Sequence, residues 1–356
     1  ARWPRRVVPR ARENATVPRS LVTIDVGAIH RNARRLAGIV RPAELWAVVK
    51  ADGYGHGAAD AARGALEGGA TALCVATVGE ALALRRVQRD VRIVVLGPTA
   101  AGDEIARARE ARLELVVSGE RVPEDVDVHL KLDTGMGRWG LAELPEPGRG
   151  VVGLMTHLAT SDTDPGFARV QLDRFLEATE PYAGMYVRHV ANSAAALTMP
   201  EARLDAARCG IALYGIDPAG KDAGRWGLEP ALRWESEVIQ VRRLARGAST
   251  GYGRRFVAVE ETWIGIVPVG YADGFRRDMT GTEVLVGTDR AEVVGTVSMD
   301  ALAVRLAAPV QTGAPVTLVG DGITLEAHAR IAQTIGYELA CGIRTSGERS
   351  TREVVG

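Results

Sequence analysis

Residues 46–57 form the stretch WAVVKADGYGHG, which decides how the larger part of the chain folds. An apolar run of strand character ends on Lys50, and a glycine-rich turn follows at once. Similar short apolar runs recur from Leu21 to about Tyr214, separated by Ala-, Arg- and Glu-rich stretches of helical period. Successive runs lie roughly 20 to 30 residues apart, the length of one strand–helix unit. Continuous apolar strands of this kind are typical of a parallel sheet that is covered on both faces.

These runs predict a (β/α)8 TIM-like barrel, with a doubly wound sheet as the alternative. After about Trp226 the sequence becomes rich in Val and Thr and is punctuated by Gly and Asp, which predicts a mainly antiparallel β domain. We therefore expect a disordered tail over residues 1–18, a barrel over 19–229 and a β-rich C-terminal domain over 230–356. The apolar runs are LVTID, LWAVVK, ALCVAT, RIVVLG, LELVVS, VHLKLD, VVGLMTH, YVRHVA and the segment that ends in GIALYG.

The composition is that of an ordinary globular protein and argues against several classes. Hydrophobic residues make up 46% and charged residues 25%, and the formal net charge is zero, so no field favours nucleic acid or an anionic membrane. No apolar run approaches the roughly 18 residues that span a bilayer. The basic, proline-broken start lacks the apolar segment of a secretory signal, and an Arg-rich contact arm is the alternative to a disordered tail. Three cysteines without a CxxC pair predict a reducing, cytoplasmic location.

Only three of the 44 basic residues are lysines: Lys50, Lys131 and Lys221. Arginine serves a solvated surface but cannot form a Schiff base, so each remaining lysine is a candidate for amine chemistry. Lys221, in the turn-like PAGKDAG, is expected at the surface. Lys50 ends an apolar run, where desolvation lowers the pKa of an amine and favours attack on an aldehyde. The alternative is a lysine that extends from a strand end into solvent.

Several polar residues lie where the predicted barrel strands end. They include Lys50, the KLDTGMGR turn, His157, the segment from His189 to Asn192, and Arg208. Because the carboxyl ends of barrel strands meet at one face, these residues predict an active site there.

The segment AVVKADGYGHG resembles the cofactor-lysine motif of alanine racemases, and further segments agree in order. The resemblance covers about residues 20 to 345. It implies a barrel that binds pyridoxal 5'-phosphate (PLP), a β domain, and a homodimer whose active sites are completed across the interface. The implied reaction interconverts L- and D-alanine and supplies D-alanine for cell-wall peptidoglycan. The matching segments are KLDTGMGR (131–138), MTHLATSD (155–162), HVANSAA (189–195), ARCGIALYG (207–215), TGYGRRF (250–256), VPVGYADGF (267–275) and GTVSMD (295–300).

The resemblance implies two catalytic residues. Lys50 would bind PLP covalently and act as the base toward the D enantiomer. Tyr252 would reach in from the other subunit and take the α-proton of the L enantiomer. Two bases suit an inversion, which removes a proton from one face and delivers one to the other. A phenol is a poor base unless nearby positive charge favours its anion, and His189 and Arg208 are candidates for a polarised network toward it.

The resemblance also implies contacts to cofactor and substrate. Arg208 would face the ring nitrogen of PLP and donate a hydrogen bond without releasing a proton, which favours racemisation over decarboxylation. Arg138 would contact the substrate carboxylate and the phenolic oxygen of the cofactor. Lys131 matches a lysine that is often carbamylated in the family. Further implied contacts are Tyr54, His157, Asn192, Ser193, Gly210 and Ile211 to the cofactor, and Tyr271, Met299 and Asp300 to the substrate.

Two positions depart from the family pattern, and other functions stay open. Thr345 stands where a phosphate-binding tyrosine is usual, and Ser298 where a cysteine often precedes Met-Asp. The alternatives are a serine-preferring or broader racemase, a non-catalytic PLP-binding barrel, which generally lacks the β domain, and an amino-acid decarboxylase. No metal site is expected, because HExxH and zinc spacings are absent. Three further histidines, for which the sequence suggests no partner, are expected to be structural: His30, His129 and His328.

Overall fold

The computed structural model describes residues 19–99, 102–119, 121–345 and 347–356, and these form two compact units. One unit comprises Val26–Glu229. The other combines residues 19–25 with Pro230–Gly356. No helix within these ranges has the length and apolar character needed to cross a membrane. The prediction of a disordered tail over residues 1–18 concerns a segment that lies outside the described residues.

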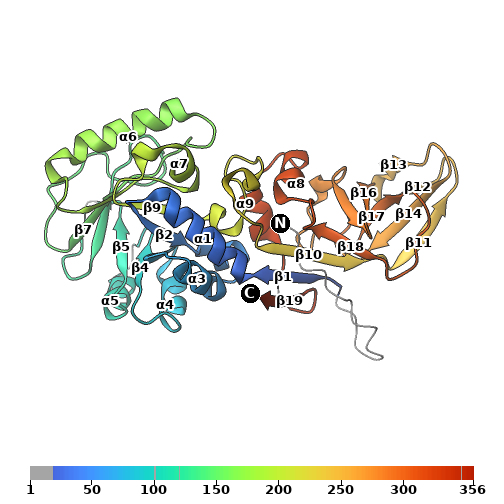
Figure 1. Cartoon of the computed structure of the whole chain (residues 1–356), viewed down its shortest axis with the longest axis horizontal. Helices are drawn as coiled ribbons and strands as arrows, with labels where there is room; N and C mark the ends of the chain where they lie inside the picture. Colours follow the sequence, from blue (N-terminus) through green and yellow to red (C-terminus); the bar gives the residue numbers. More distant parts are fainter. Residues whose placement is uncertain (1–18, 100–101, 120, 346) are drawn as a thin grey trace. The chain divides into compact units, whose positions relative to one another are not determined.

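The unit Val26–Glu229 is a closed parallel barrel, which confirms the predicted fold class (Figure 1). Its eight described strands follow one another around the barrel in chain order, and the first pairs with the last. This closure excludes the doubly wound alternative. The strands are β2 (Glu44–Val48), β3 (Ala72–Val75), β4 (Arg92–Val95), β5 (Glu114–Val117), β6 (Val128–Lys131), β7 (Val151–Met155), β8 (Val187–His189) and β9 (Ala206–Cys209).

Amphipathic helices lie outside the barrel strands (Figure 1). In α1 (Val26–Val40) the apolar residues recur three and four apart and are buried, as a helix that packs on a sheet requires. Asn32 of α1 donates to the carbonyls of Leu213 and Glu229 and ties this helix to the end of the unit. The remaining helices are α2 (Lys50–Tyr54), α3 (Ala58–Glu67), α4 (Val78–Arg85), α5 (Gly102–Glu110), α6 (Pro165–Thr179) and α7 (Ser193–Thr198), with short 3-10 turns η1 (Glu180–Tyr182), η2 (Pro200–Ala202), η3 (Ile211–Tyr214) and η4 (Ala223–Trp226).

One predicted barrel strand belongs to the other unit. The LVTID run forms β1 (Leu21–Asp25), which pairs antiparallel with β10 (Leu232–Glu237) and parallel with β19 (Thr351–Val355). The sequence contains nine apolar runs, but the barrel closes with eight, so the first is available to another sheet. The assignment of residues 19–25 to the barrel is therefore wrong.

The second unit is a mainly antiparallel β domain, as predicted. Among the described residues its sheet has nine strands in the order β11-β14-β17-β16-β15-β18-β10-β1-β19. Strands β12 (Ser249–Thr250) and β13 (Phe256–Val257) form a separate pair. The other elements are β11 (Gln240–Leu244), β14 (Thr262–Val267), β15 (Glu283–Val286), β16 (Asp289–Val294), β17 (Leu302–Leu306), β18 (Pro315–Val319), η5 (Tyr252–Arg254), η6 (Arg277–Met279), α8 (Leu325–Ile331) and α9 (Gly336–Gly342).

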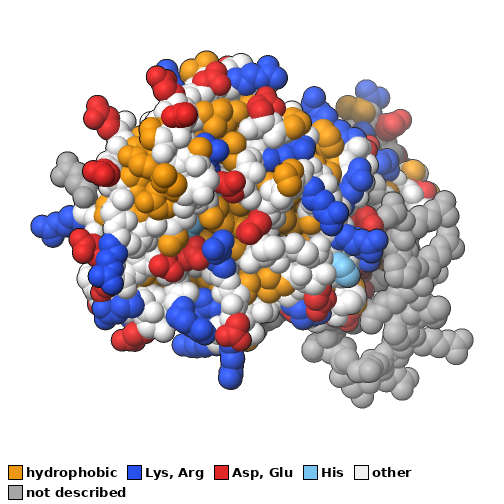
Figure 2. Space-filling model, turned by 60° about the vertical axis from the view of Figure 1, so that its left-hand side comes forward, with side chains coloured by type: hydrophobic (Ala, Val, Ile, Leu, Met, Phe, Trp, Pro, Cys, Tyr) orange, Lys and Arg blue, Asp and Glu red, His pale blue; other side chains and the backbone are white. Residues whose placement is uncertain are grey.

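The surface carries charges of both signs. Figure 2 shows basic and acidic side chains interspersed with apolar ones over one face, and neither sign dominates it. Exposed pairs such as Arg31–Glu229 and Arg109–Asp125 contribute to this mixture. The pattern agrees with a formal net charge of zero.

Candidate active site

Lys50 lies two residues after the end of β2, and a left-handed turn begins at the next residue. The four residues after it, 51–54, have φ between 50° and 64°. Only Gly53 among them adopts this conformation without steric cost, and each L residue costs roughly 1–2 kcal/mol there. Such strain persists only where surrounding contacts hold the backbone, and it is characteristic of functional sites.

Glu80, which the sequence analysis did not select, holds the start of this turn. One carboxylate oxygen accepts the Ala51 N–H at 2.8 Å, and the other accepts the N–H groups of Ala76 at 2.7 Å and Thr77 at 3.2 Å. The Thr77 hydroxyl in turn accepts the Glu80 N–H, which completes a capping box at the start of α4. The spacing of Thr77 and Glu80 is visible in the sequence. The bond to Ala51 joins the ends of two neighbouring strands and has no sequence signal.

Tyr54, Ser193 and Gly210 lie together in segments that follow β2, β8 and β9. The Gly210 N–H donates to the Ser193 hydroxyl at 2.9 Å. A Cβ atom on Gly210 would lie only 2.4 Å from the Tyr54 hydroxyl oxygen, so this close approach requires glycine. Asn192 caps α7 by accepting the Ala195 N–H. The cluster offers two hydroxyls and a turn of backbone, which are groups that bind phosphate.

Arg208 of β9 is buried, and its two terminal nitrogens are fully used. Nη1 donates to His189 Nδ1 and to the His189 carbonyl, both at 2.7 Å. Nη2 donates to the carbonyls of Thr156 at 2.9 Å and Val190 at 3.0 Å, and lies 3.4 Å from His157 Nδ1. The Nε–H has no acceptor among the described residues. Burial lowers the pKa of Arg208 to about 10, so the guanidinium stays charged at neutral pH.

His157 and His189 are neutral in this environment. Burial lowers the pKa of each well below its usual value, and the charge of Arg208 lowers it further. His189 contacts a further histidine, His129, for which the sequence suggested no partner. His129 lies 2.9 Å from His189 on one side and 2.8 Å from Glu114 on the other.

Lys131 and Arg138 both contact the ring of Trp139. The Lys131 Nζ lies 4.7 Å and the Arg138 guanidinium carbon 3.9 Å from its ring centroid. Lys131 is only 2% exposed, and burial, with the charges of Arg138 and Arg208, lowers its pKa to about 8. Within the described ranges no carboxylate forms an ion pair with it. Asp133 accepts three consecutive backbone N–H groups and so fixes the loop that presents Arg138.

Three predicted residues of the β-rich unit have large exposed side chains. Tyr252, Tyr271 and Met299 are 72%, 41% and 52% exposed. The Tyr252 carbonyl accepts a hydrogen bond from the Thr296 hydroxyl at 2.8 Å, and this bond anchors the Tyr252 backbone. The phenol side chain itself is exposed. Exposed aromatic and Met side chains of this size are typical of surfaces that bind another molecule.

The segments that carry Tyr271 and Met299 are joined through their backbones. The Tyr271 N–H donates to the Ser298 carbonyl at 3.0 Å, and the N–H of the next residue donates to the Met299 carbonyl at 3.1 Å. Asp300 accepts from Arg349 at 2.7 Å, and Arg349 also binds the buried carboxylate of Asp273. Asp273 and Arg349, which the sequence did not single out, thus hold the segments that carry Tyr271 and Asp300.

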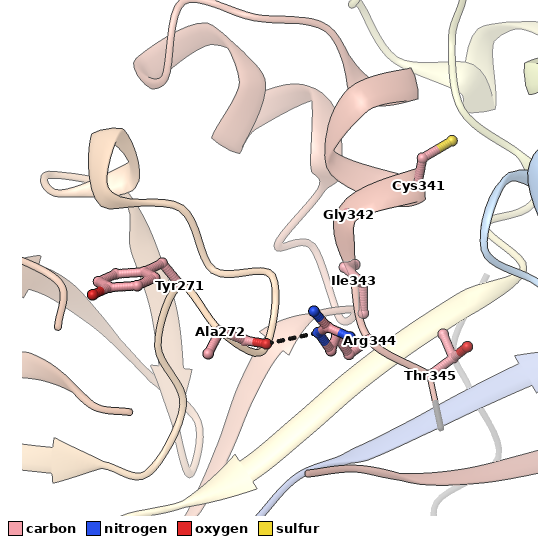
Figure 3. A pocket seen from close by; sticks show the side chains of 7 residues that line it. All are labelled: Tyr271, Ala272, Cys341, Gly342, Ile343, Arg344 and Thr345. Atoms are coloured by element: carbon pink, nitrogen blue, oxygen red, sulfur yellow. Dashed lines mark hydrogen bonds between the residues drawn. The ribbon is translucent and has the colours of Figure 1, made fainter. Parts of the chain in front are cut away.

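A cavity of about 380 Å³ lies beside Tyr271 and is drawn in Figure 3. Arg344 lines it and donates to the Ala272 carbonyl at 2.9 Å. The Tyr271 ring and the Cys341 thiol point away from one another on either side of this bond. Thr345 also lines this cavity.

The chain matches two family models in succession, "Alanine racemase, N-terminal domain" over residues 24–218 and "Alanine racemase, C-terminal domain" over residues 231–351. The chain belongs to the alanine racemase family. A family member from Lactiplantibacillus plantarum is 41% identical over an alignment that covers 90% of this chain and 94% of that protein. The crystal structure of alanine racemase from E. faecalis has a TM-score of 0.85 at 36% identity and covers 95% of this chain and 98% of its own. That of the biosynthetic alanine racemase from Pseudomonas aeruginosa has a TM-score of 0.86 at 34% identity and covers 96% and 100%.

In this member of the alanine racemase family, the predicted site residues divide between the two units. The barrel unit carries Lys50, Tyr54, Lys131, Arg138, His157, His189, Asn192, Ser193, Arg208, Gly210 and Ile211. The β-rich unit carries Tyr252, Tyr271, Ser298, Met299, Asp300 and Thr345.

Proposed function

We propose that this protein is a PLP-dependent alanine racemase that works as a homodimer and uses Lys50 and Tyr252 as its two bases. The observation that carries the proposal is the buried Arg208, whose single unused donor, the Nε–H, fits a ring nitrogen that must not be protonated. The D-alanine formed would serve peptidoglycan synthesis. A cytoplasmic location stays a prediction; it rests on three cysteines, all within the described ranges, that form no disulfide.

The residues present fit the cofactor. PLP supplies an aldehyde that captures the amino group of the substrate and a ring that withdraws electrons from Cα. Lys50 offers the amine that holds it, at the start of a strained and well-anchored turn. Tyr54, Ser193 and the backbone at Gly210 and Ile211 would bind the phosphate.

The roles of the side chains follow from their chemistry. Lys50 would move a proton at Cα on one face of the substrate, and Tyr252 of the partner subunit on the other. Arg208 keeps its proton, so it would donate a hydrogen bond to the ring nitrogen of the cofactor without protonating it. A ring held in this way would withdraw electrons less strongly, which would favour return of a proton to Cα. An amino-acid decarboxylase of this architecture would instead need a carboxylate at the ring nitrogen. The exposed guanidinium of Arg138 would bind the substrate carboxylate.

The β-rich unit supports the racemase against the non-catalytic alternative. A protein that only carries the cofactor has no use for the exposed Tyr252 and Met299, which the homodimer would place over the neighbouring barrel. Chiral product analysis with a panel of L-amino acids separates an alanine racemase from a serine-preferring or broader one.

We propose further that Lys131 is carbamylated. Its lowered pKa makes the neutral amine, the form that reacts with CO₂, accessible near neutral pH. The carbamate would be an anion beside Arg138 and Arg208, and would replace a like-charge contact with an attractive one.

The test of the two-base proposal is solvent-deuterium exchange at Cα, measured separately for each enantiomer. Tyr252→Phe should lose exchange from L-alanine while exchange from D-alanine continues. Tyr182→Phe is the matched control, because it removes the same hydroxyl from a tyrosine of the barrel unit outside the site, and should leave both exchanges unchanged. Equal exchange from both enantiomers in Tyr252→Phe would show that the base assignment is wrong.

A further inference from the structure

A chain of hydrogen bonds passes through the interior of the barrel from the proposed site. Arg208 Nη1 lies 2.7 Å from His189 Nδ1, His189 Nε2 lies 2.9 Å from His129 Nδ1, and His129 Nε2 lies 2.8 Å from Glu114 Oε2. We call Arg208, His189, His129 and Glu114 the imidazole chain. It begins in β9 and ends at the first residue of β5, near the amino ends of the strands.

Every proton in the imidazole chain has a fixed place. Arg208 can only donate, so His189 Nδ1 must be an unprotonated acceptor. A neutral His189 then carries its proton on Nε2 and donates it to His129 Nδ1. His129 in turn carries its proton on Nε2 and donates it to Glu114. The donors all point the same way, from a cation at one end to an anion at the other.

The barrel is shaped to admit this chain. β7 lies between β6, which carries His129, and β8, which carries His189. Beside His129, β7 has Gly153, and a Cβ atom at this position would come within 1.9 Å of His129 Nδ1. Trp46, fully buried, packs against both imidazoles with centroid distances of 5.7 Å and 4.6 Å. The interior of such a barrel is ordinarily filled by branched apolar side chains, so a satisfied polar chain is a specific feature.

Glu114 is held as an anion at the far end. Burial alone would raise its pKa, but the hydrogen bond from His129 and the charge of Arg92 outweigh this effect and lower it. Arg92 Nε donates to the second oxygen of Glu114 at 2.8 Å. Both carboxylate oxygens therefore accept charged or polarised donors.

We propose that His129 and Glu114 are positioning residues of the proposed racemase, which fix the Nε2–H tautomer of neutral His189 and so aim the Arg208 Nε–H at the ring nitrogen of the cofactor. With Nη1 and Nη2 held by His189 and backbone carbonyls, the planar guanidinium cannot turn, and the direction of its remaining donor is set. The inference rests on the proposed function for the identity of the group that accepts this donor.

The imidazole chain is not a path for protons. Transfer along it would require Arg208 to accept a proton or His189 to reverse its donor, and a guanidinium at the end forbids both. The chain therefore acts by polarisation and orientation.

The first test is ¹⁵N NMR of the purified protein with labelled histidine, which does not depend on racemase activity. Each of the six histidines gives a pair of ring signals that identifies its tautomer. His129 and His189 should each show a protonated Nε2 and an unprotonated Nδ1. In His129→Phe and in Glu114→Gln, the His189 Nε2 signal should shift toward that of a weaker hydrogen bond. Protonation of His189 on Nδ1, or a His189 spectrum unaffected by both changes, would overturn the inference.

The second test separates positioning from general loss of structure by steady-state kinetics. His129→Phe should lower kcat about tenfold, which corresponds to the net contribution of about one hydrogen bond. Glu114→Gln should lower kcat about threefold, because only part of such a contribution is lost. KM for alanine should change less than twofold in both variants. Glu114→Gln keeps the size of the side chain and is the informative variant if His129→Phe does not fold. Asp127→Asn removes an exposed carboxylate from the residue that precedes β6, at the same end of the barrel and outside the imidazole chain, and should change neither kcat nor the His189 signals.

The two tests distinguish the possible failures. An active wild type whose kcat and His189 spectrum are unaffected by Glu114→Gln contradicts the positioning inference and leaves the racemase proposal standing. A wild type with the expected tautomers but without racemase activity contradicts the proposed function instead.

Discussion

Lys131 lies among positive charges that a lysine would ordinarily avoid. It ends β6 in a buried position, and both its ammonium and the Arg138 guanidinium contact the Trp139 ring. Burial is the larger cause of its lowered pKa, and the charges of Arg138 and Arg208 add to it. Strongly shifted pKa values of this kind cluster at functional sites, which agrees with the proposed carbamylation of Lys131.

The stability of the protein should therefore depend on pH through Lys131. Its pKa falls from 10.5 to about 8 on folding, so between these values the unfolded chain binds more protons. The free energy of unfolding should rise as pH increases from 8 to 10.5. Below pH 8 the charged lysine costs on the order of 3 kcal/mol.

Lys131→Met should remove this dependence in CO₂-free buffer. Urea unfolding should show the variant more stable than wild type at pH 7, with the difference shrinking toward pH 10. Lys221→Met is the matched control and should leave the pH profile unchanged. Added bicarbonate should stabilise only a chain that keeps Lys131, because the carbamate removes the buried positive charge. A difference that does not vary with pH would contradict the assignment of the burial cost to Lys131.

The turn after β2 and the start of α4 share a single carboxylate, that of Glu80. Glu80 closes the capping box of α4 with one oxygen and holds the Ala51 N–H with the other. The left-handed turn that presents Lys50 thus depends on a residue of the next strand–helix unit. Both Glu80 oxygens are needed, because one accepts from Ala51 and the other accepts from Ala76 and Thr77.

Glu80→Gln and Glu80→Ala should separate these two purposes. Glutamine still closes the capping box, so Glu80→Gln should change the free energy of unfolding by less than about 1 kcal/mol. Glu80→Ala should lose about 1–3 kcal/mol, because several backbone donors lose their acceptor. Both should lower kcat, because the amide of Gln has one carbonyl oxygen and leaves Ala51 unheld. Urea unfolding and steady-state kinetics measure the two effects, and full activity in both variants would show that Ala51 needs no anchor.

The helices and strands differ in how far their positions could be predicted from the sequence. Strands β2 to β9 were predictable because each is a continuous apolar run. The polar residues near the ends of these runs, such as Lys50 and His157, could be selected from the same pattern. Tyr252, Tyr271 and Met299 were selected only through the family resemblance. β1 was assigned to the wrong unit because LVTID has the same apolar character as a barrel strand, and its partners lie more than 200 residues away. The Glu80–Ala51 bond and the fit of His129 against Gly153 were not predictable, since both join neighbouring strands whose register only the fold determines.

In the proposed homodimer each active site takes residues from two subunits. Lys50→Ala and Tyr252→Phe should each be nearly inactive. Coexpressed in equal amounts, they should form mixed dimers for half of the population, and one of the two sites in each mixed dimer would carry neither substitution. Activity should therefore recover to about a quarter of the wild-type value.

Recovery of activity in the mixed dimers requires that each active site combine residues of two protomers. Lys50→Ala coexpressed with the double variant Lys50→Ala, Tyr252→Phe is the control, because no protomer then supplies the lysine, and it should stay inactive. If each protomer built its own site, no combination of the two single variants would restore one. Absence of recovery in dimers shown to be mixed would contradict the shared site.

Lys50 is proposed to carry the cofactor on its side-chain amine, and reduction with sodium borohydride followed by peptide mapping identifies the residue that does so. The reduction fixes PLP to the amine that holds it, and the chain offers only three lysines for comparison. The cofactor mass is expected on the peptide that contains Lys50 and on neither of the peptides that contain Lys131 and Lys221. Cofactor fixed to another side chain, or a purified protein that binds none, would contradict it.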